Sequence, residues 1–428
     1  MPDLGDLPAH RPLPATVRRD ARRRLQAGLA PRSGRAVVGA LALALTVLAV
    51  PLGAAVLTVG SRTDVTPAAG AEIPQLQAVP PEQMFDARSG APRDAARRCT
   101  AAGGREAARW QPILTVSARG DTVVAYRTGS GARFCELTPA TVALSAAASA
   151  AGDGTPRITY VSALGTVAGV TGPGTGDVTV FDPGTPDPMT ESGNPAVTRD
   201  GVFVLPNTFS GTIGSLRLTA GATSIVVEAA DLPRAVTPRT DRPQPAGDAS
   251  SAAGRGLADC LGGATPPIVD PHAWQPGAVL ALNDNERILL GRYHDLLAVC
   301  VRRGAPGAPG TPTVTVDEGG ASSGLRTAEA DGNALFFTRT VFYGFRATSQ
   351  GASASDTVAV TGLVKDPRVA TVSISRPHRA AVTAPVTGGT FILPGIGLNE
   401  GAGPDGDRSR ISALDSQGRP LGSAMISS

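Results

Sequence analysis

The residues most able to do chemistry are the cysteines, because a thiol can form a disulfide, bind a metal ion or act as a nucleophile. Each half of the chain holds two of them, and a Trp-Gln-Pro tripeptide lies between the two members of each pair. The interval from Trp110 to Cys135 is 25 residues, and that from Trp274 to Cys300 is 26. Since the chain has only 4 cysteines and 2 tryptophans, this recurrence indicates one module that is used twice.

The even number of cysteines is typical of disulfides in an exported protein, and four cysteines allow three pairings. The repeated spacing favours the pairing that stays within each half, Cys99–Cys135 and Cys260–Cys300. Each bridge would close a loop of about 40 residues and stabilise its module by about 3–4 kcal/mol in the chain-entropy model. The alternative is four buried free thiols, which accounts less well for the repeated spacing.

Two histidines flank the second Trp–Cys element, and an aspartate lies close to each: His272 with Asp270, and His294 with Asp295. Imidazole and carboxylate groups near one another suit metal binding or acid/base catalysis. The first half has neither histidine at the matching place, which favours exposed loop residues. The sequence therefore assigns no catalytic, cofactor-binding or metal-binding residue, and no cofactor is expected.

Two further motifs are better explained as loops. A Gly-x-Ser-x-Gly match at residues 320–324 lies in Gly/Ser-rich sequence, whereas a nucleophile elbow needs a strand before it and a helix after it. Oxygen ligands gather at Asn399-Glu400 and at residues 405–409, but the EF-hand spacing is missing and Arg408 interrupts the set. We expect a solvated turn there.

The two tryptophans admit two interpretations. Indole rings on an exposed face stack on sugars, and cell-wall glycans are plausible ligands outside a bacterium. A Trp-Gln-Pro that precedes a strand inside a disulfide loop is better explained by core packing against the bridge. We therefore expect Trp110 and Trp274 to be core residues.

The elements that must position these residues begin with a membrane signal. Residues 1–35 are rich in arginine, and residues 36–59 carry no charge. At about 1.5 Å per residue this apolar stretch is long enough to cross a bilayer core of about 30 Å. The positive-inside rule then places the basic arm in the cytoplasm and the chain after residue 60 outside the membrane. The alternative is a cleaved signal peptide.

Short segments rich in Val and Thr, separated by Gly, Pro, Asp and Ser, fill the chain after a Pro/Ala-rich stalk at residues 60–95. This pattern is typical of antiparallel β sandwiches or barrels. We predict a mainly β protein with two related sandwich- or barrel-like modules after one N-terminal transmembrane helix, and short helical stretches within 85–109 and 252–261. The modules span residues 96–230 and 259–428, and a Pro/Arg-rich linker at 231–258 joins them.

A second repeated element extends the duplication. Val197-Thr198 followed by the Phe-x-Leu-Pro of residues 203–206 resembles Val386-Thr387 followed by the Phe-x-Leu-Pro of residues 391–394. Both elements are rich in β-branched residues, which favours strands.

Composition excludes some functions. The net charge is only +3 and aromatic residues make up 4% of the chain. There is no Walker loop, His-Glu-x-x-His or dinucleotide glycine pattern. The basic arm lacks interleaved aromatic residues and a folded reader, so we expect no nucleic-acid partner.

Four features together resemble those of a known family. They are the arm with Leu13-Pro14-Ala15-Thr16-Val17-Arg18-Arg19, one Ala/Leu membrane segment, a Cys–Trp–Cys element and a Val-rich region ending in Phe-x-Leu-Pro. The family is that of single-pass envelope proteins of high-GC actinobacteria with no assigned function. The resemblance implies a cell-membrane location and carries no active site.

Three functional hypotheses follow. The first is a membrane-anchored, extracytoplasmic binding or interaction protein that is not an enzyme, held in the lipid bilayer by residues 36–59, with an envelope protein or a cell-wall component as its partner. The second is a transmembrane regulator, similar to anti-sigma factors, that signals through the short arginine-rich arm. The third is an envelope hydrolase with an unrecognised carboxylate site.

Overall fold

The computed structural model divides the chain into two units, Met1–Gln77 and Ala78–Ser428. It describes residues 85–149, 154–172, 175–182, 193–283, 286–303, 312–318, 326–330, 333–341, 347–348, 351–352, 359–376, 379–394 and 409–426. The predicted cytoplasmic arm, the predicted transmembrane helix at 36–59 and most of the predicted stalk lie outside the described residues. Within these ranges, no helix combines the length and the hydropathy that a membrane span requires.

The described residues are mainly β, as predicted, and the named strands pair antiparallel throughout. Region 1, residues 85–240, opens with a sheet of order β1-β2-β3-β4-β5-β14. Its strands are β1 (Asp86–Ser89), β2 (Gln111–Ala118), β3 (Asp121–Thr128), β4 (Gly131–Leu137), β5 (Thr141–Leu144) and β14 (Arg239–Thr240).

Two four-stranded sheets complete region 1. The first has the order β10-β11-β7-β6, and the second β13-β12-β8-β9. Their strands are β6 (Arg157–Val161), β7 (Val167–Val170), β8 (Val178–Phe181), β9 (Asn194–Pro195), β10 (Val197–Arg199), β11 (Val202–Leu205), β12 (Leu216–Ala220) and β13 (Thr223–Val227).

Region 2, residues 251–426, has three four-stranded sheets of order β15-β16-β17-β18, β19-β20-β23-β26 and β25-β24-β27-β28, and a small β21-β22 pair. The strands are β15 (Gln275–Asn283), β16 (Glu286–Tyr293), β17 (Leu296–Arg303), β18 (Thr313–Glu318), β19 (Arg326–Ala330), β20 (Asn333–Val341), β21 (Ala347–Thr348), β22 (Gly351–Ala352), β23 (Ala359–Val364), β24 (Thr371–Arg376), β25 (Arg379–Pro385), β26 (Thr390–Leu393), β27 (Ser409–Leu414) and β28 (Pro420–Ile426).

Strand order is shared by the two regions. The last sheet of region 1 has β8 between β9 and the hairpin β12–β13. The last sheet of region 2 likewise has β24 between β25 and the hairpin β27–β28. In the middle sheet of each, the strand with the Phe-x-Leu-Pro element (β11 or β26) pairs with β7 or β23.

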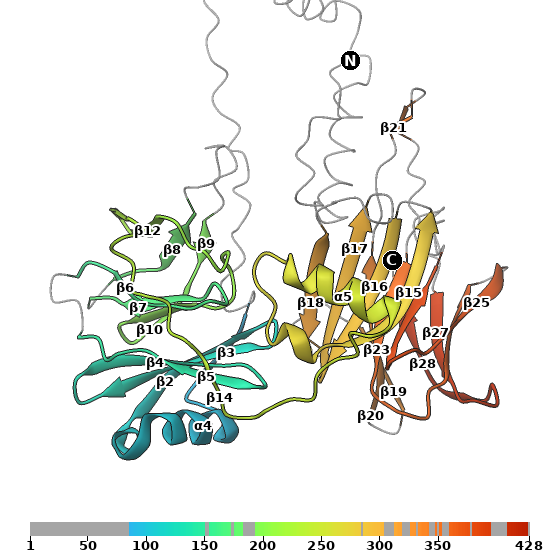
Figure 1. Cartoon of the computed structure of the whole chain (residues 1–428), viewed down its shortest axis with the longest axis horizontal. Helices are drawn as coiled ribbons and strands as arrows, with labels where there is room; N and C mark the ends of the chain where they lie inside the picture. The colour runs from blue at the N-terminus through green and yellow to red at the C-terminus, as the bar shows by residue number, and fades with distance from the viewer. Residues whose placement is uncertain are drawn as a thin grey trace, which may run out of the picture. The chain divides into compact units, whose positions relative to one another are not determined.

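A short helix precedes the first meander of each region and lies against one face of it (Figure 1). Helix α4 (Arg93–Gly103) buries Ala95, Arg98 and Cys99, which are spaced three and four residues apart and so share one helix face. Helix α5 (Ala252–Gly262) is capped by Ser251, whose hydroxyl accepts a hydrogen bond from Gly254 N at 3.0 Å. Helix α4 falls within the stretch predicted as helical at 85–109, and α5 matches the stretch predicted at 252–261 except that it ends one residue later.

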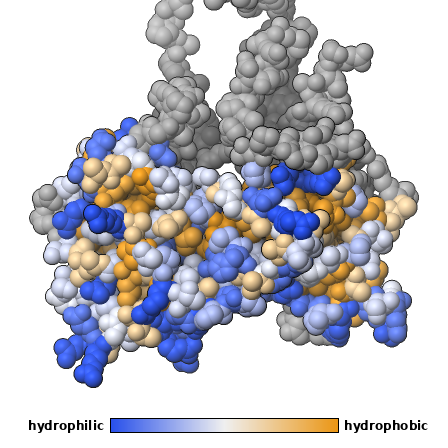
Figure 2. Space-filling model, viewed as in Figure 1, coloured by the Kyte–Doolittle hydropathy of each residue, from blue (hydrophilic) through white to orange (hydrophobic). Residues whose placement is uncertain are grey.

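Strand β3 shows how alternation builds the core of region 1. Val123 and Ala125 contribute to one apolar cluster, and Val124 and Tyr126 contribute to another on the opposite face, beneath α4. Because successive side chains of a strand point to opposite faces, a strand covered on both faces is a continuous apolar run. On the face drawn in Figure 2, hydrophobic residues form separate patches among hydrophilic ones.

Two short strands lie in ranges predicted as connecting segments. β1 lies within 60–95 and pairs with β2, so the sheet begins before Cys99. β14 lies within 231–258 and pairs with β5 through Arg239 and Thr240. Both occupy edge positions of one sheet, where two to four backbone pairs are enough to order a Pro/Arg-rich chain.

Candidate functional site

The four cysteines form the two disulfides that the spacing predicts. Cys99 of α4 is bonded to Cys135 of β4, with Cα atoms 6.0 Å apart, and Cys260 of α5 to Cys300 of β17, with Cα atoms 6.3 Å apart. All four are fully buried, and the two bridges occupy matching positions, each joining the leading helix to the third strand of its meander. No free cysteine is present among the described residues.

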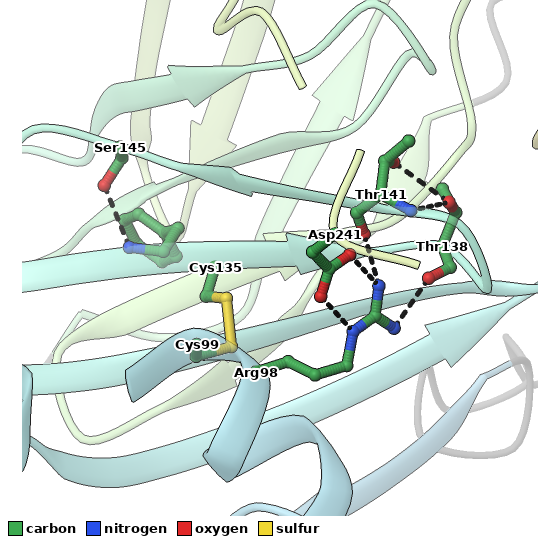
Figure 3. Close-up of a disulfide and its surroundings, with 8 residues drawn as sticks. Arg98, Cys99, Cys135, Thr138, Thr141, Ser145 and Asp241 are labelled. Atoms are coloured by element: carbon green, nitrogen blue, oxygen red, sulfur yellow. Dashed lines mark hydrogen bonds and ion pairs between the residues drawn. A yellow bond between two sulfur atoms is a disulfide. The ribbon is translucent and has the colours of Figure 1, made fainter. Parts of the chain in front are cut away.

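Arg98, which is next to Cys99 of the first disulfide, makes a network of hydrogen bonds to other segments (Figure 3). Its guanidinium group donates to both carboxylate oxygens of Asp241 at 2.8 and 2.6 Å, and to the carbonyl oxygens of Thr138 and Thr141 at 2.7 and 2.9 Å. These hydrogen bonds lower the pKa of Asp241. Arg98 thus connects α4 with β5 and with the segment after β14. Its positive charge is paired with the Asp241 carboxylate and stabilises the fold.

The two tryptophans lie in different environments. Trp274 is 3% exposed and donates from Nε1 to the Val269 carbonyl at 2.8 Å, which makes it a core residue. Trp110 is half-buried, packs on Tyr126 with ring centroids 5.6 Å apart, and carries the Arg133 guanidinium 4.9 Å from its own centroid. One face of the Trp110 ring is therefore already covered by a cation.

The predicted histidine and aspartate neighbours are not brought together. His294 Nε2 lies 3.2 Å from Gln244 Oε1, and Asp295 pairs with Lys365. Asp270 is buried, and it accepts hydrogen bonds from Thr138 Oγ1 at 2.8 Å, Ala140 N at 3.0 Å and Tyr293 Oη at 2.8 Å. Asp270 therefore links residues of region 1 and region 2.

The remaining sequence motifs lie outside the described residues. These are the Gly-x-Ser-x-Gly match at 320–324 and the oxygen-rich residues 399–400 and 405–408. Across the described ranges, no group of three His, Cys, Asp or Glu side chains is arranged to hold a metal ion.

A buried pair of acidic residues in region 1, Asp121 and Glu136, was not predicted from the sequence. Glu136 accepts hydrogen bonds from Tyr160 Oη at 2.9 Å and Ser162 Oγ at 2.8 Å, and Asp121 accepts one from Thr166 Oγ1 at 2.9 Å. The two carboxyl groups are in hydrogen-bonding contact, and Asp121 Oδ1 has no donor among the described groups. Protonation of Asp121 would allow the two carboxyl groups to share a proton.

Burial raises the pKa of both carboxyl groups, and for Asp121 the charge of Glu136 raises the pKa further, well above the usual range. Perturbed carboxyl groups are common in active sites. Here Asp121 is 0% and Glu136 4% exposed, so no substrate reaches them. Their chemistry is a structural one that depends on protonation.

An open groove of about 620 Å³ lies at one end of region 1. Arg127 reaches it from the end of β3, and two other segments contribute: residues 171–172 and 175–177 between β7 and β8, and the β10–β11 hairpin. The described residues that line it are all Arg, Asp, Thr or Gly, namely Arg127, Thr171, Gly172, Thr175, Gly176, Asp177, Thr198, Arg199, Asp200 and Gly201.

A tight turn presents the hairpin side of the groove. Asp200 and Gly201 both have positive φ angles, of 47° and 79°, which is the backbone of a two-residue type I′ hairpin. Thr171 N donates to the Gly201 carbonyl at 2.8 Å and holds the turn against the end of β7. The turn therefore projects Arg199 and Asp200 to the rim at a fixed place.

Several polar side chains of the groove have no partner among the described residues. The side chains of Arg127, Asp177 and Asp200 are exposed and make no hydrogen bond or ion pair there. Thr198 Oγ1 is buried and also lacks a partner there. Buried polar atoms are normally satisfied, so an orphaned hydroxyl beside a groove favours an absent hydrogen-bonding ligand or water.

The equivalent place in region 2 is filled. Gly388 and Gly389 form the matching turn, with φ angles of 56° and 72°. A methyl group added to Gly388 would overlap the Pro276 carbonyl, and one added to Gly389 would overlap the Arg292 guanidinium. Thr390 Oγ1 also accepts a hydrogen bond from Ala278 N at 2.8 Å. The turn of region 2 therefore packs directly on β15 and β16.

The sequence matches no protein-family model, and no curated protein is similar to it.

Proposed function

We propose that this chain is a membrane-anchored, extracytoplasmic binding protein built from two related β modules, and that the first module binds the ligand. Residues 36–59 are the anchor and the folded modules face away from the cytoplasm. The two disulfides support this location, because disulfides persist in oxidising compartments and are rare in the cytosol. The shared strand order and the matching helix-to-strand bridges support the duplication.

The observation that carries the binding role is the difference between two equivalent turns. In the second module the Gly388–Gly389 turn is packed against Arg292 and β15, as a purely structural turn would be. In the first module the Asp200–Gly201 turn leaves a groove with partnerless charged groups and an orphaned hydroxyl. The exposed charged groups are hydrated, whereas the buried Thr198 hydroxyl costs stability while it has no partner.

The lining supports binding more than catalysis. The described residues of the lining include no histidine, cysteine, lysine or serine, which are the commonest catalytic bases and nucleophiles. Asp177 and Asp200 do share the groove, which makes a hydrolase with a carboxylate pair the second candidate. Incubation of the purified protein with peptidoglycan and ester substrates separates the two, because a binding protein leaves them intact.

A photocrosslinking experiment tests the binding role in the full-length protein in intact cells. Gly176 is exposed and a Cβ there would meet no heavy atom within 4 Å, so a photoreactive amino acid fits at this position. Gly214 is exposed and unobstructed in the same way, lies outside the groove lining and provides the matched control. Covalent adducts formed from position 176 and absent from position 214 are expected. Equal labelling at both positions, or none at 176, would contradict the proposal.

A further inference from the structure

We propose that the groove of the first module takes a zwitterionic ligand, one with a carboxylate and an ammonium group separated by a polar backbone, such as a short peptide with both ends free. This inference rests on the proposed binding function and specifies the ligand class. It is carried by the charges that line the groove and by the hydroxyl left without a partner.

The lining has both signs of charge in equal number. Arg127 and Arg199 supply two guanidinium groups, and Asp177 and Asp200 supply two carboxylates. Arg199 donates from Nη1 to Ser89 Oγ at 2.5 Å, so Arg127 is the cation best placed to receive an anion. An arginine binds a carboxylate through two parallel hydrogen bonds, and an aspartate pairs readily with an ammonium group.

The same lining argues against other ligand classes. The described residues of the lining include no large apolar or aromatic side chain, so neither a hydrophobic ligand nor stacking on a sugar ring is favoured. A polyanion would meet the two carboxylates, and a simple cation would leave Arg127 unpaired. A ligand with both charges satisfies the groups on both sides at once.

The size and the remaining polar groups suit a short peptide. A volume of about 620 Å³ lies within the ~300–1,000 Å³ of small-ligand pockets. The Thr198 hydroxyl can donate to or accept from a peptide group, which presents both an N–H and a carbonyl. A short peptide with both ends free thus supplies a carboxylate for Arg127, an ammonium group for the aspartates and peptide groups for Thr198.

Calorimetric titration with four related compounds tests this ligand class. The protein used is the full-length chain, purified in detergent. The probes are triglycine, N-acetyl-triglycine, triglycine amide and the doubly blocked N-acetyl-triglycine amide, with maltose as a neutral polyol. We expect triglycine to bind, and blocking either end to weaken binding about tenfold or more, as loss of a charged hydrogen bond does.

Two groove variants and one control variant locate the binding. Arg127→Ala and Asp200→Asn should each weaken triglycine binding about tenfold or more. Arg105→Ala, an exposed arginine on the helical side of the module, should leave it unchanged. Retention of both disulfides and of the melting temperature shows that each variant is folded.

Each other outcome is decisive. Binding of maltose or of the doubly blocked peptide as tight as triglycine would overturn the zwitterion while leaving the groove as a binding site. Failure of all the probes to bind the folded protein would overturn the ligand class. The crosslinking experiment at position 176 tests the binding function independently of this result. Binding that survives both groove substitutions would place the peptide elsewhere.

Discussion

Arg127 and Arg292 occupy the same register position in two equivalent sheets, yet only one of them lies against a hairpin turn. Each pairs across its sheet with the glutamine that follows a tryptophan, Gln111 for Arg127 and Gln275 for Arg292. Arg292 packs against Gly389, while Arg127 lines the open groove. Equivalent register positions thus serve packing in one module and line an open groove in the other.

The buried acidic pair predicts an unusual dependence of stability on pH. The pKa of Asp121 is raised in the folded protein, so the folded state retains a proton that the unfolded chain releases above its usual value of 3.8. The stabilisation is therefore complete below that pH and declines as the pH rises from about 4 towards the raised pKa. We expect the melting temperature of the wild type to carry this falling component between pH 4 and 7.

Asp121→Asn removes the ionisable group and keeps an oxygen that accepts from Thr166. The difference in melting temperature between wild type and variant should shrink as the pH rises. At pH 7 the melting temperature of the variant should equal or exceed that of the wild type. Asp200→Asn, on the groove rim, serves as the control. An Asp121→Asn variant whose melting curve follows the wild type in parallel across the pH range would contradict the shared proton.

The two disulfides should contribute comparably to stability. They close loops of 36 and 40 residues, for which the chain-entropy model gives about 3–4 kcal/mol each. Urea unfolding of the Cys99→Ala/Cys135→Ala and Cys260→Ala/Cys300→Ala double variants should show losses of this size. A loss below about 1 kcal/mol for either pair would remove its assigned role.

Arg98 should be a large single contributor among the polar residues. Arg98→Met leaves Asp241 and two carbonyl oxygens without their donor, and breaking a buried pair in this way costs about 3 kcal/mol or more. Asp241 is more exposed, so Asp241→Asn should cost less. Because Arg98 lowers the pKa of Asp241, this pair stabilises above the unfolded value and its contribution is lost as the pH falls through the lowered pKa. Acid titration of the Arg98→Met melting temperature should lack that loss.

Asp270 should couple the residues of the two modules that it contacts. Its φ of 44° lies in the left-handed region, which Asn tolerates and Ala disfavours. Asp270→Ala removes three hydrogen bonds as well, so we expect a loss of about 2–4 kcal/mol and faster amide exchange around Ala140. Asp270→Asn should lose less. Equal effects of the two substitutions would show that neither backbone conformation nor the amide oxygen matters.

Much of the fold was predictable because apolar alternation and turn residues are local signals. The short apolar segments at 141–144, 157–161 and 390–393, which are rich in β-branched and aromatic residues, form β5, β6 and β26. Strand β7 is harder to predict because it is short and is interrupted by Gly169. A methyl group at Gly169 would overlap the Arg157 carbonyl of the neighbouring strand, so glycine there reflects close packing and not a turn.

The functional features were less predictable because they depend on contacts between distant segments. The sequence of β4 mixes apolar and polar residues, which predicts a partly exposed strand. Glu136 is nevertheless buried, and it accepts hydrogen bonds from Tyr160 and Ser162 of a later hairpin. The groove combines three separate segments. One signal was present in the sequence: the repeated Val-Thr element continues with Arg199-Asp200-Gly201 in one copy and with Gly388-Gly389 in the other.

The most direct test of the account is an in-cell crosslinking and pull-down of three full-length versions: wild type, a version with residues 1–35 replaced by an unrelated basic arm, and Arg127→Ala. The account predicts that the wild type and the arm replacement recover the same envelope components, and that Arg127→Ala loses them. Retention by Arg127→Ala, with loss of a cytoplasmic regulator on arm replacement, would contradict it and indicate a transmembrane regulator instead.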